Sequence, residues 1–354
     1  MKKSYPCFSL LIAIAAIRVA VGQDAPAPIA PQPQSVVQAV AAAGAGMPSG
    51  DDLLTRAASQ LERRASIATH LRHQVAVEGQ QFFGAGTYLQ QGSGDELKVR
   101  LELEMVGSNA KLLQVCNSRF LWIDRQLPNG RNVTRYDLRQ LRADPALAPP
   151  EFDKLDGGKA NWSPAQPLML AHSGGLPSLL GSLGENFNFL PPQPMRLAME
   201  PPVSTKPINV PVFAIVGQWK PEKLAALIAK PEDPSKAGKS KKPKPPKIPE
   251  RLPQEVLLLV GQADLFPYRI EYRQLETPVT ANPDGPPIPY HLSSHPIVVL
   301  EMADVVFDAP IPAGQFDYTP GDADWLDQTA ALIERLRRER REQVAARDAE
   351  QSTR

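Results

Sequence analysis

The sequence predicts an α+β fold in which helices pack against a large, curved antiparallel sheet. Strand-like segments follow one another at short intervals, and the separators between them are rich in Gly, Ser, Asn and Pro. Segments with helical periodicity stand before and between the strands. The separators of the first strands are too short for a crossover helix, so consecutive strands are expected to pair antiparallel.

The first 23 residues have the composition of a secretory signal peptide. Lys2 and Lys3 form a basic start, an apolar stretch runs from Cys7 to Ile17, and Ala20 to Gly22 provide a small-residue cleavage site. The 11-residue apolar stretch is too short to span about 30 Å of hydrocarbon, which argues against the alternative of a membrane anchor. We expect an exported protein, periplasmic or otherwise, that is soluble once this segment is removed.

Composition limits the folded part of the chain and its partners. The 354 residues include 38 prolines, roughly twice the usual share of about 5%. Residues 24–50 are mostly Ala, Pro and Gln and are expected to form a disordered leader. Three of the 39 basic residues and none of the 38 acidic ones lie in the first 22 residues, so the rest carries a net charge of −2. This near-neutral charge argues against nucleic acid as the main partner.

The first half of the predicted domain begins with a helix and continues as strands. Asp51 and Asp52 cap a helix expected to run to about Ala76, with an apolar stripe at a 3.6-residue spacing. The four expected strands that follow are Gln80 to Gln90, Leu97 to Val106, Lys111 to Asp124 and Asn132 to Leu141.

The second half is expected to resume the sheet after an irregular insertion. Residues 143–211 are proline-rich, with short helices expected at Pro164 to His172 and Leu176 to Asn186. The remaining expected elements are strands at Val212 to Lys220, Glu255 to Gly261, Tyr268 to Leu275 and Ile297 to Phe307, a helix at Pro221 to Ala229, and a helix at Asp322 to Ala349 with a charged second half. A Lys/Pro-rich loop at 231–253 carries six lysines, which could give weak contact with a membrane surface but are more simply solubilising.

No pattern in the sequence predicts an enzyme, a metal site or a cofactor. His70 and His73 are three apart on the expected first helix, but a third metal ligand is missing. His291 and His295 flank two serines, and His172 precedes Ser173, without a nucleophile elbow around either. Cys116, the one cysteine beyond the signal segment, is expected to be a buried, inert thiol. The sequence therefore predicts binding in place of catalysis.

The leading candidate for a binding surface is the apolar side of the alternating strand from Leu97 to Val106. Its charged residues, Lys98, Arg100, Glu102 and Glu104, are expected on the outside of the sheet. The alternative is an ordinary core between the sheet and its helices. The candidate ligand-contacting residues are Leu97, Val99, Leu101, Leu103, Met105, Phe120, Trp122, Phe213, Ile215, Leu257, Leu259, Ile270, Leu300 and Met302.

The order of these segments resembles the periplasmic lipoprotein carrier family, the LolA/LolB-like proteins. The resemblance rests on an amphipathic helix that leads into Val77 to Leu89, the strand from Lys98 to Met105, the passage from Leu113 to Ile123, the short strand from Asn132 to Leu138, and the turn from Phe307 to Gly314. It implies an incomplete β-barrel over about residues 51–320, wrapped around helices, followed by the charged helix at 321–354.

That resemblance also implies a function and one residue role. The barrel would hold acyl chains of lipids or lipoproteins in a hydrophobic cavity, as part of lipid or lipoprotein transport in the envelope. Arg100 lies near the position where the family's carriers use an arginine to hold a helical lid, although the usual Arg-Pro context is missing. The alternative is an envelope scaffold or sensor that uses the same fold to engage other envelope proteins.

Overall fold

The computed structural model describes residues 37–39, 48–77, 80–144, 174–199, 204–228, 252–275 and 294–352, and it confirms the predicted fold class. Its strands are β1 (Val37–Ala39), β2 (Ser66–Val77), β3 (Gln80–Gln91), β4 (Lys98–Met105), β5 (Lys111–Asn117), β6 (Phe120–Leu127), β7 (Gly130–Asp137), β8 (Phe187–Phe189), β9 (Gln193–Met199), β10 (Ile208–Trp219), β11 (Glu255–Gly261), β12 (Pro267–Leu275), β13 (Ser294–Phe307) and β14 (Trp325–Asp327). Its α-helices are α2 (Gly50–Glu62), α3 (Leu138–Ala143), α4 (Gly175–Asn186), α5 (Pro221–Ile228) and α6 (Thr329–Ser352).

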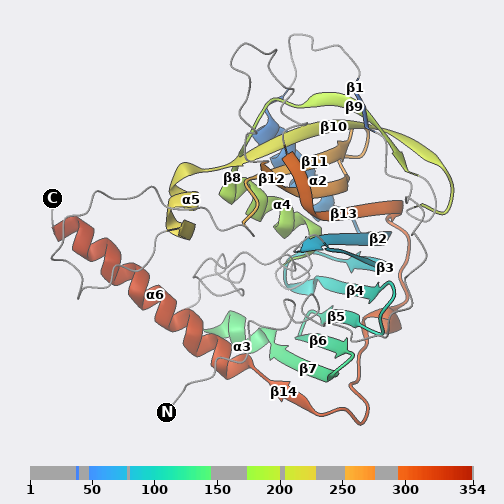
Figure 1. Cartoon of the computed structure of the whole chain (residues 1–354). Helices are drawn as coiled ribbons and strands as arrows, with labels where there is room; N and C mark the ends of the chain where they lie inside the picture. The colour runs from blue at the N-terminus through green and yellow to red at the C-terminus, as the bar shows by residue number, and fades with distance from the viewer. Residues whose placement is uncertain are drawn as a thin grey trace, which may run out of the picture.

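The strands form one curved, mostly antiparallel sheet that is not closed into a barrel (Figure 1). Their order is β1-β9-β10-β11-β12-β13-β2-β3-β4-β5-β6-β7-β14, with β8 paired to β10 beside this path. All neighbours are antiparallel except β14, which joins β7 in parallel. At the middle of the sheet, β13 lies between β12 and β2 and joins the late strands to the early ones.

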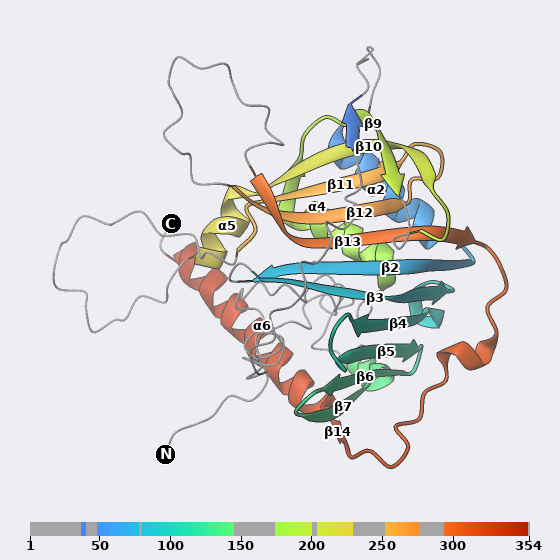
Figure 2. The same ribbon diagram turned by 45° about the vertical axis from the view of Figure 1, so that its right-hand side comes forward.

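Helices α2 and α4 lie together on one face of the sheet, within its curve (Figures 1 and 2). Ser49 caps α2 by accepting a hydrogen bond from the backbone N–H of Asp52 at 3.0 Å, and two aspartates in the first turn complement the helix dipole. Leucines from both helices and from the strands form one buried cluster. We call the sheet face covered by α2 and α4 the inner face and the opposite one the outer face.

The strand register assigns each side chain to a face. Residues directly opposite each other on neighbouring strands point the same way, so the row Leu300, His73, Gly84, Met105 lies on the inner face. Along β4, Val99, Leu101 and Leu103 therefore face inward and are at most 3% exposed, while Arg100 and Glu102 face outward. The predicted division of this strand into an apolar inner row and a charged outer row is confirmed.

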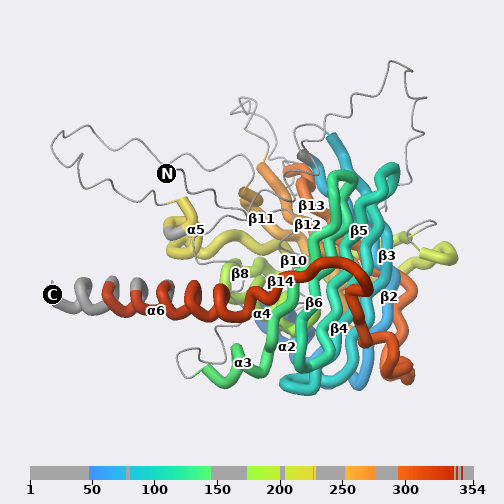
Figure 3. Tube along the Cα trace, turned by 90° about the horizontal axis from the view of Figure 1, so that it is seen from below, coloured from blue at the N-terminus to red at the C-terminus, as the bar shows by residue number. Residues whose placement is uncertain are grey.

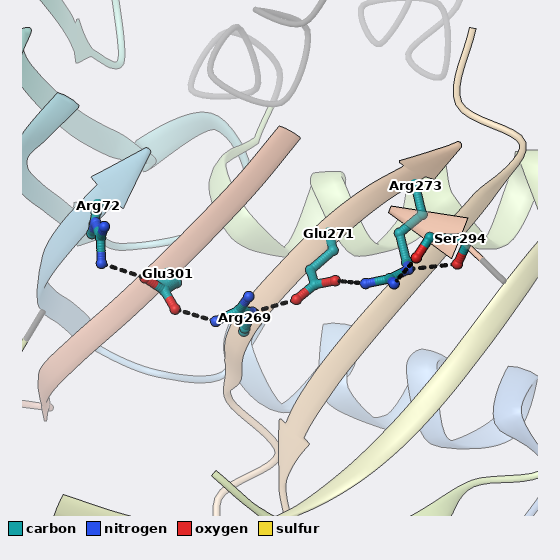
Figure 4. A network of polar contacts seen from close by, with 6 residues as sticks. All are labelled: Arg72, Arg269, Glu271, Arg273, Ser294 and Glu301. Atoms are coloured by element: carbon teal, nitrogen blue, oxygen red, sulfur yellow. Dashed lines mark hydrogen bonds and ion pairs between the residues drawn. The ribbon is translucent and has the colours of Figure 1, made fainter. Parts of the chain in front are cut away.

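The outer face of the central strands carries a chain of ion pairs across three strands (Figure 4). Arg72 on β2 contacts Glu301 on β13 at 3.5 Å, and the other carboxylate oxygen of Glu301 accepts a hydrogen bond from Arg269 on β12. Arg269 also contacts Glu271 at 2.5 Å, and Glu271 accepts from Arg273. The five side chains are only 4–15% exposed. Each buried charge therefore depends on its neighbours for compensation.

A strap of residues 308–324 runs from the end of β13 around the outside of the sheet to β14 (Figures 1 and 3). Arg100 donates to the carbonyl of Gln315 at 2.9 Å, and Phe316 is only 1% exposed. Further along, the Tyr318 hydroxyl donates to Asp124 on β6 at 2.9 Å, and its ring lies 5.4 Å from that of Trp122. The strap thus covers outward-facing residues of β4 to β6.

We expect the junction of the strap with the sheet to loosen in acid. Asp327 on β14 pairs with Arg135 on β7 at 2.5 Å. Partial burial raises the pKa of Asp327, but hydrogen bonds from Thr329 and Arg135 outweigh this and lower the pKa below its usual value. A lowered folded-state pKa means that the stabilisation is present above about pH 3.9 and is lost as the pH falls further. Tryptophan fluorescence should therefore report separation of the Trp325 ring from the Trp122 ring, 5.4 Å away in the folded protein, below about pH 4.

Two variants distinguish loosening of this junction from unfolding of the whole protein in acid. Asp327→Asn should show the acid form of the fluorescence already at neutral pH, whereas Asp322→Asn, at an exposed position of the strap, should titrate like the parent protein. An unchanged spectrum in Asp327→Asn would contradict the expectation.

Two predicted element boundaries in the first half are wrong. The helix expected to run to Ala76 ends at Glu62, and the chain continues as β2, which places His70 and His73 on a strand. The strand expected from Lys111 to Asp124 is two strands, because the chain turns at Ser118, which has a φ of 69°. The side chain of Asn117 stabilises this turn by accepting hydrogen bonds from the backbone N–H groups of Arg119 and Phe120.

Other differences concern the ends of strands and the proline-rich regions. The strand expected from Asn132 to Leu141 ends at Asp137, which caps the short helix α3. The insertion at 143–211 contains β8, β9 and the first residues of β10, and the leader contributes β1. The helix expected from Asp322 begins only at Thr329, after β14. Helices α4 and α5 and strands β11 and β12 are found within one residue of the predicted bounds.

Several predictions lie outside the described residues. They are the signal segment, the helix at Pro164 to His172, His291 and nearly all of the Lys/Pro-rich loop at 231–253. The division of the chain into leader, domain and C-terminal helix also stays a prediction.

Candidate functional site

A cavity with a volume of about 960 Å³ lies beside α2 and α4 on the inner side of the sheet. This size falls within the range of about 300–1,000 Å³ that is typical of pockets for small molecules. Its α2 lining extends from Asp51 to Glu62, so at 1.5 Å per residue the cavity follows this helix for about 16 Å.

The wall of the cavity has apolar and polar parts. The apolar part is formed by side chains that are each at most 8% exposed: Leu54, Leu97, Cys116, Leu138 and Leu180. Charged residues also line the cavity. They come from both ends of α2, from α3, from α4, from the segment before β4 and from the position between β10 and α5. These charged residues are Asp51, Glu62, Asp95, Arg142, Glu185 and Lys220. Such a wall suits an elongated molecule that has an apolar body and a polar end.

Both basic residues of the lining already have partners within the protein. Lys220 donates to the carbonyl of Gly184 at 2.8 Å, and Arg142 contacts Asp95 at 3.1 Å and donates to the carbonyl of Ser118. Burial raises the pKa of the Cys116 thiol above its usual value. The thiol is therefore protonated at neutral pH, as the predicted inert role requires.

Helix α4 presents a small-residue surface to the cavity. Gly174, Ser178, Gly181 and Gly184 all line it, at helical spacing. A Cβ atom built on Gly181 meets no atom within 4 Å, which shows that open space begins directly at the helix backbone. The sequence analysis missed this surface, although the small residues of the segment Gly174 to Gly184 recur every three or four positions and could have indicated it.

The structure separates the predicted ligand-contacting residues into two groups. Ten of them lie on or next to the inner face: Leu97, Val99, Leu101, Leu103, Met105, Phe213, Ile215, Ile270, Leu300 and Met302. Of these, only Leu97 lines the cavity. Val99, Leu101 and Leu103 belong to the same buried cluster as the leucines of α2 and α4, so here the row is the protein's own core.

The other four predicted residues do not share a wall with this row. Trp122 is opposite Val115, which is opposite the outward-facing Arg100, and Phe120 lies two residues away on the same face. Leu257 and Leu259 are opposite Glu271 and Arg269 and therefore also face outward. Placing these four on the inner face was wrong.

Arg100 does not hold a helix over the cavity. It lies on the outer face, where it contacts Glu102 and the carbonyl of Gln315 in the strap. The lid contact implied by the resemblance is therefore wrong in this structure, because β4 directs Arg100 away from α2 and α4.

No metal site emerges from the residues that the structure describes: they contain no group of three or more His, Cys, Asp or Glu placed to hold an ion. His73 is buried on the inner face, whereas His70 is exposed on the outer face and contacts Asp304 at 3.1 Å. The described helices also include none that is both long and apolar enough to cross a membrane.

Comparison with known proteins finds similarity only at the level of structure. No protein-family model and no curated protein matches the chain. A DUF1329 family protein from Desulfovibrio piger is similar with a TM-score of 0.31 and 11% identity, over 76% of this chain and 96% of that chain. A domain from Vibrio parahaemolyticus named for outer membrane lipoprotein sorting has a TM-score of 0.29 and 7% identity, over 76% and 96%.

A LolA superfamily protein from Nitrosomonas europaea is similar with a TM-score of 0.27 and 14% identity, over 77% of this chain and 98% of that chain. At these values nothing about ligands follows from the likeness. This last protein is named for the family that the sequence resembles.

Proposed function

We propose that this protein is an exported, non-enzymatic binding protein that holds an acyl chain of a lipid or lipoprotein in the cavity beside α2 and α4. The observation that supports this most directly is the combination of an apolar inner wall with charged residues around it, in a cavity of about 960 Å³. Burial of each methylene group contributes about 0.8 kcal/mol, so a long chain gains affinity without specific polar contacts. Export rests on the signal segment read from the sequence.

The proposed ligand site is beside α2 and α4, and not on the apolar face of β4 that the sequence indicated. The inner face under β4 is filled by leucines of the protein itself, and the free volume lies where α4 has no large side chains. Lipid and lipoprotein transport in the envelope would be the setting. Envelope proteins as partners, and membrane contact through the lysine loop, stay predictions.

Filling the cavity from α4 tests the proposal. Gly181→Phe should place a ring in the open space next to the helix and lower the affinity for a fluorescent fatty acid at least tenfold. Gly181→Ala is the matched control: it should bind like the parent protein and gain about 0.5–1 kcal/mol of stability, because glycine is unfavourable inside a helix. Both variants are compared by fluorescence titration and thermal unfolding.

Two results would count against this function. Equal affinity of Gly181→Phe and Gly181→Ala would show that the fatty acid binds elsewhere. Failure of the parent protein to bind the probe, together with recovery of only ligand-free protein in native mass spectrometry, would remove the proposal itself.

A further inference from the structure

The first turn of α4 is capped by residues of the sheet and not by its own sequence. The residue at the N-cap position is Gly174, which has no side chain to accept a hydrogen bond. Instead, the backbone N–H of Leu176 donates to the Tyr88 hydroxyl at 3.1 Å and to Oε1 of Gln90 at 3.3 Å. The Tyr88 hydroxyl in turn donates to Oε1 of Gln90 at 2.6 Å.

Tyr88 and Gln90 are buried, neighbouring positions on the inner face of β3, with exposures of 5% and 2%. Their hydrogen bonds to α4 therefore lie inside an otherwise apolar cluster. Burial also raises the pKa of the Tyr88 hydroxyl, so this group stays protonated and can keep donating to Gln90 over the physiological pH range.

Two glycines at the start of α4 allow the helix to approach Tyr88 and Gln90 closely. Gly174 and Gly175 have φ values of 146° and 68°, both in the region that favours glycine. A Cβ on Gly175 would lie 2.4 Å from Oε1 of Gln90 and 2.6 Å from the Tyr88 hydroxyl, so only glycine lets the helix reach the pair.

The other end of α4 is held differently. Phe187 follows the helix directly, begins β8, and stacks on Trp219 with ring centroids 4.2 Å apart. The carbonyl of Asn186 accepts a hydrogen bond from the backbone N–H of Lys220 at 2.9 Å. The C-terminal end is thus joined to the sheet through its backbone. At the N-terminal end, Leu176 and Leu179 are buried in the core, and the polar contacts come from the two side chains of β3.

The end of α4 that contacts Tyr88 and Gln90 borders the cavity. Gly174, Pro177 and Ser178 of α4 line it, as does Gln90 itself. Displacement of the first turn away from β3 would therefore widen the cavity at this end, without moving the end that is joined to β8.

We infer that Tyr88 and Gln90 form a latch that holds the first turn of α4 closed, and that release of this latch controls how fast a ligand enters and leaves the cavity. The role for a ligand rests on the function proposed above. Tyr88 and Gln90 act here as positioning residues. We expect the latch to close in both the free and the ligand-bound protein, so its loss should change rates more than affinity.

Tyr88→Phe tests the latch, because it removes the hydroxyl and keeps the ring. In stopped-flow measurements with a fluorescent fatty acid, it should raise both uptake and release rates about tenfold and change the dissociation constant less than twofold. Tyr136→Phe is the matched control, since the Tyr136 hydroxyl contacts Gln328 of the C-terminal region and not α4. Its rates should equal those of the parent protein. Gln90→Met provides a second latch variant with the same expected direction.

A ligand-free measurement separates the latch from the proposed function. In a Cys7→Ser background, Cys116 is the remaining cysteine and lines the cavity, so its alkylation rate by a maleimide reports opening. Tyr88→Phe should raise this rate about tenfold at unchanged thermal midpoint. Faster alkylation without any fatty-acid binding would overturn the function and support the latch. Unchanged alkylation and exchange rates in both latch variants, or a lower thermal midpoint as their sole effect, would overturn the latch.

Discussion

Replacing Glu301 by glutamine is expected to lower the free energy of unfolding by about 3–5 kcal/mol, the cost of leaving buried charges without their partner. The Glu301 side chain is 6% exposed and contacts both Arg72 and Arg269. Glutamine has nearly the same shape but no charge, so the two guanidinium groups would keep their buried positions and lose a common counter-charge. Urea unfolding followed by tryptophan fluorescence measures the change.

Glu104→Gln is the matched control for this experiment. Glu104 lies on the same outer face and pairs with Lys111 at 2.5 Å, but its side chain is 67% exposed. Exposed ion pairs contribute about 0–1 kcal/mol, so the control should lose no more than that. If Glu301→Gln and Glu104→Gln lowered the free energy of unfolding equally, burial of the ion pairs would not determine how much they stabilise the protein.

Gly86→Ala is expected to destabilise the protein by about 3 kcal/mol, because the added methyl group has no room. A Cβ on Gly86 would lie 1.8 Å from the carbonyl oxygen of Glu102, and a backbone atom in a paired strand cannot move aside alone. The change should appear as a lower midpoint of urea unfolding with an unchanged slope.

Gly84→Ala provides the comparison on the same strand. Its Cβ would meet side-chain atoms of Leu103 and Met105 at 3.0–3.1 Å, and such side chains can shift by a few tenths of an ångström. We expect a change within about 1 kcal/mol. A loss in Gly86→Ala as small as this would mean that β3 and β4 separate easily, against the observed register.

The sequence predicted the alternating strand well and the two-sided strands poorly. In β4 one face is apolar and the other charged, so the pattern alone assigns the faces correctly. In β6 and β11 the runs Leu121 to Ile123 and Val256 to Val260 are apolar on both sides, because both faces are buried. Periodicity cannot distinguish the faces of such a strand. Trp122 is covered by Tyr318 and Trp325, which come much later in the chain.

The error in the first helix has a local cause. The spacing of Ala65, Ala68 and Leu71 continues the helical stripe of α2, while the same region also alternates as Ile67, Thr69, Leu71 and His73 do on the inner face of β2. Together, these residues fit both the 3.6-residue spacing of a helix and the two-residue alternation of a strand. The β-branched residues Ile67, Thr69 and Val75 favour the strand and were the local signal for it.

The candidate cavity was harder to predict than the fold. Its position depends on where α4 packs, and α4 is fixed by Tyr88 and Gln90, which are far from it in the sequence. Gly181 matters because nothing stands in front of it, and an absence of neighbours leaves no trace in a single sequence.

The place of β13 between β12 and β2 also has a consequence for how the chain folds. Val299 pairs with Gln74, and these residues are separated by more than 200 positions. The meander from β2 to β7 can form from local contacts, but its junction with the other half requires the segment up to Phe307. Pairing β13 with β2 is slow, because the chain between them loses conformational entropy before the stabilising contacts form. The complete sheet is therefore a late product of folding, and a chain with its central strand pair still open is the expected kinetic intermediate.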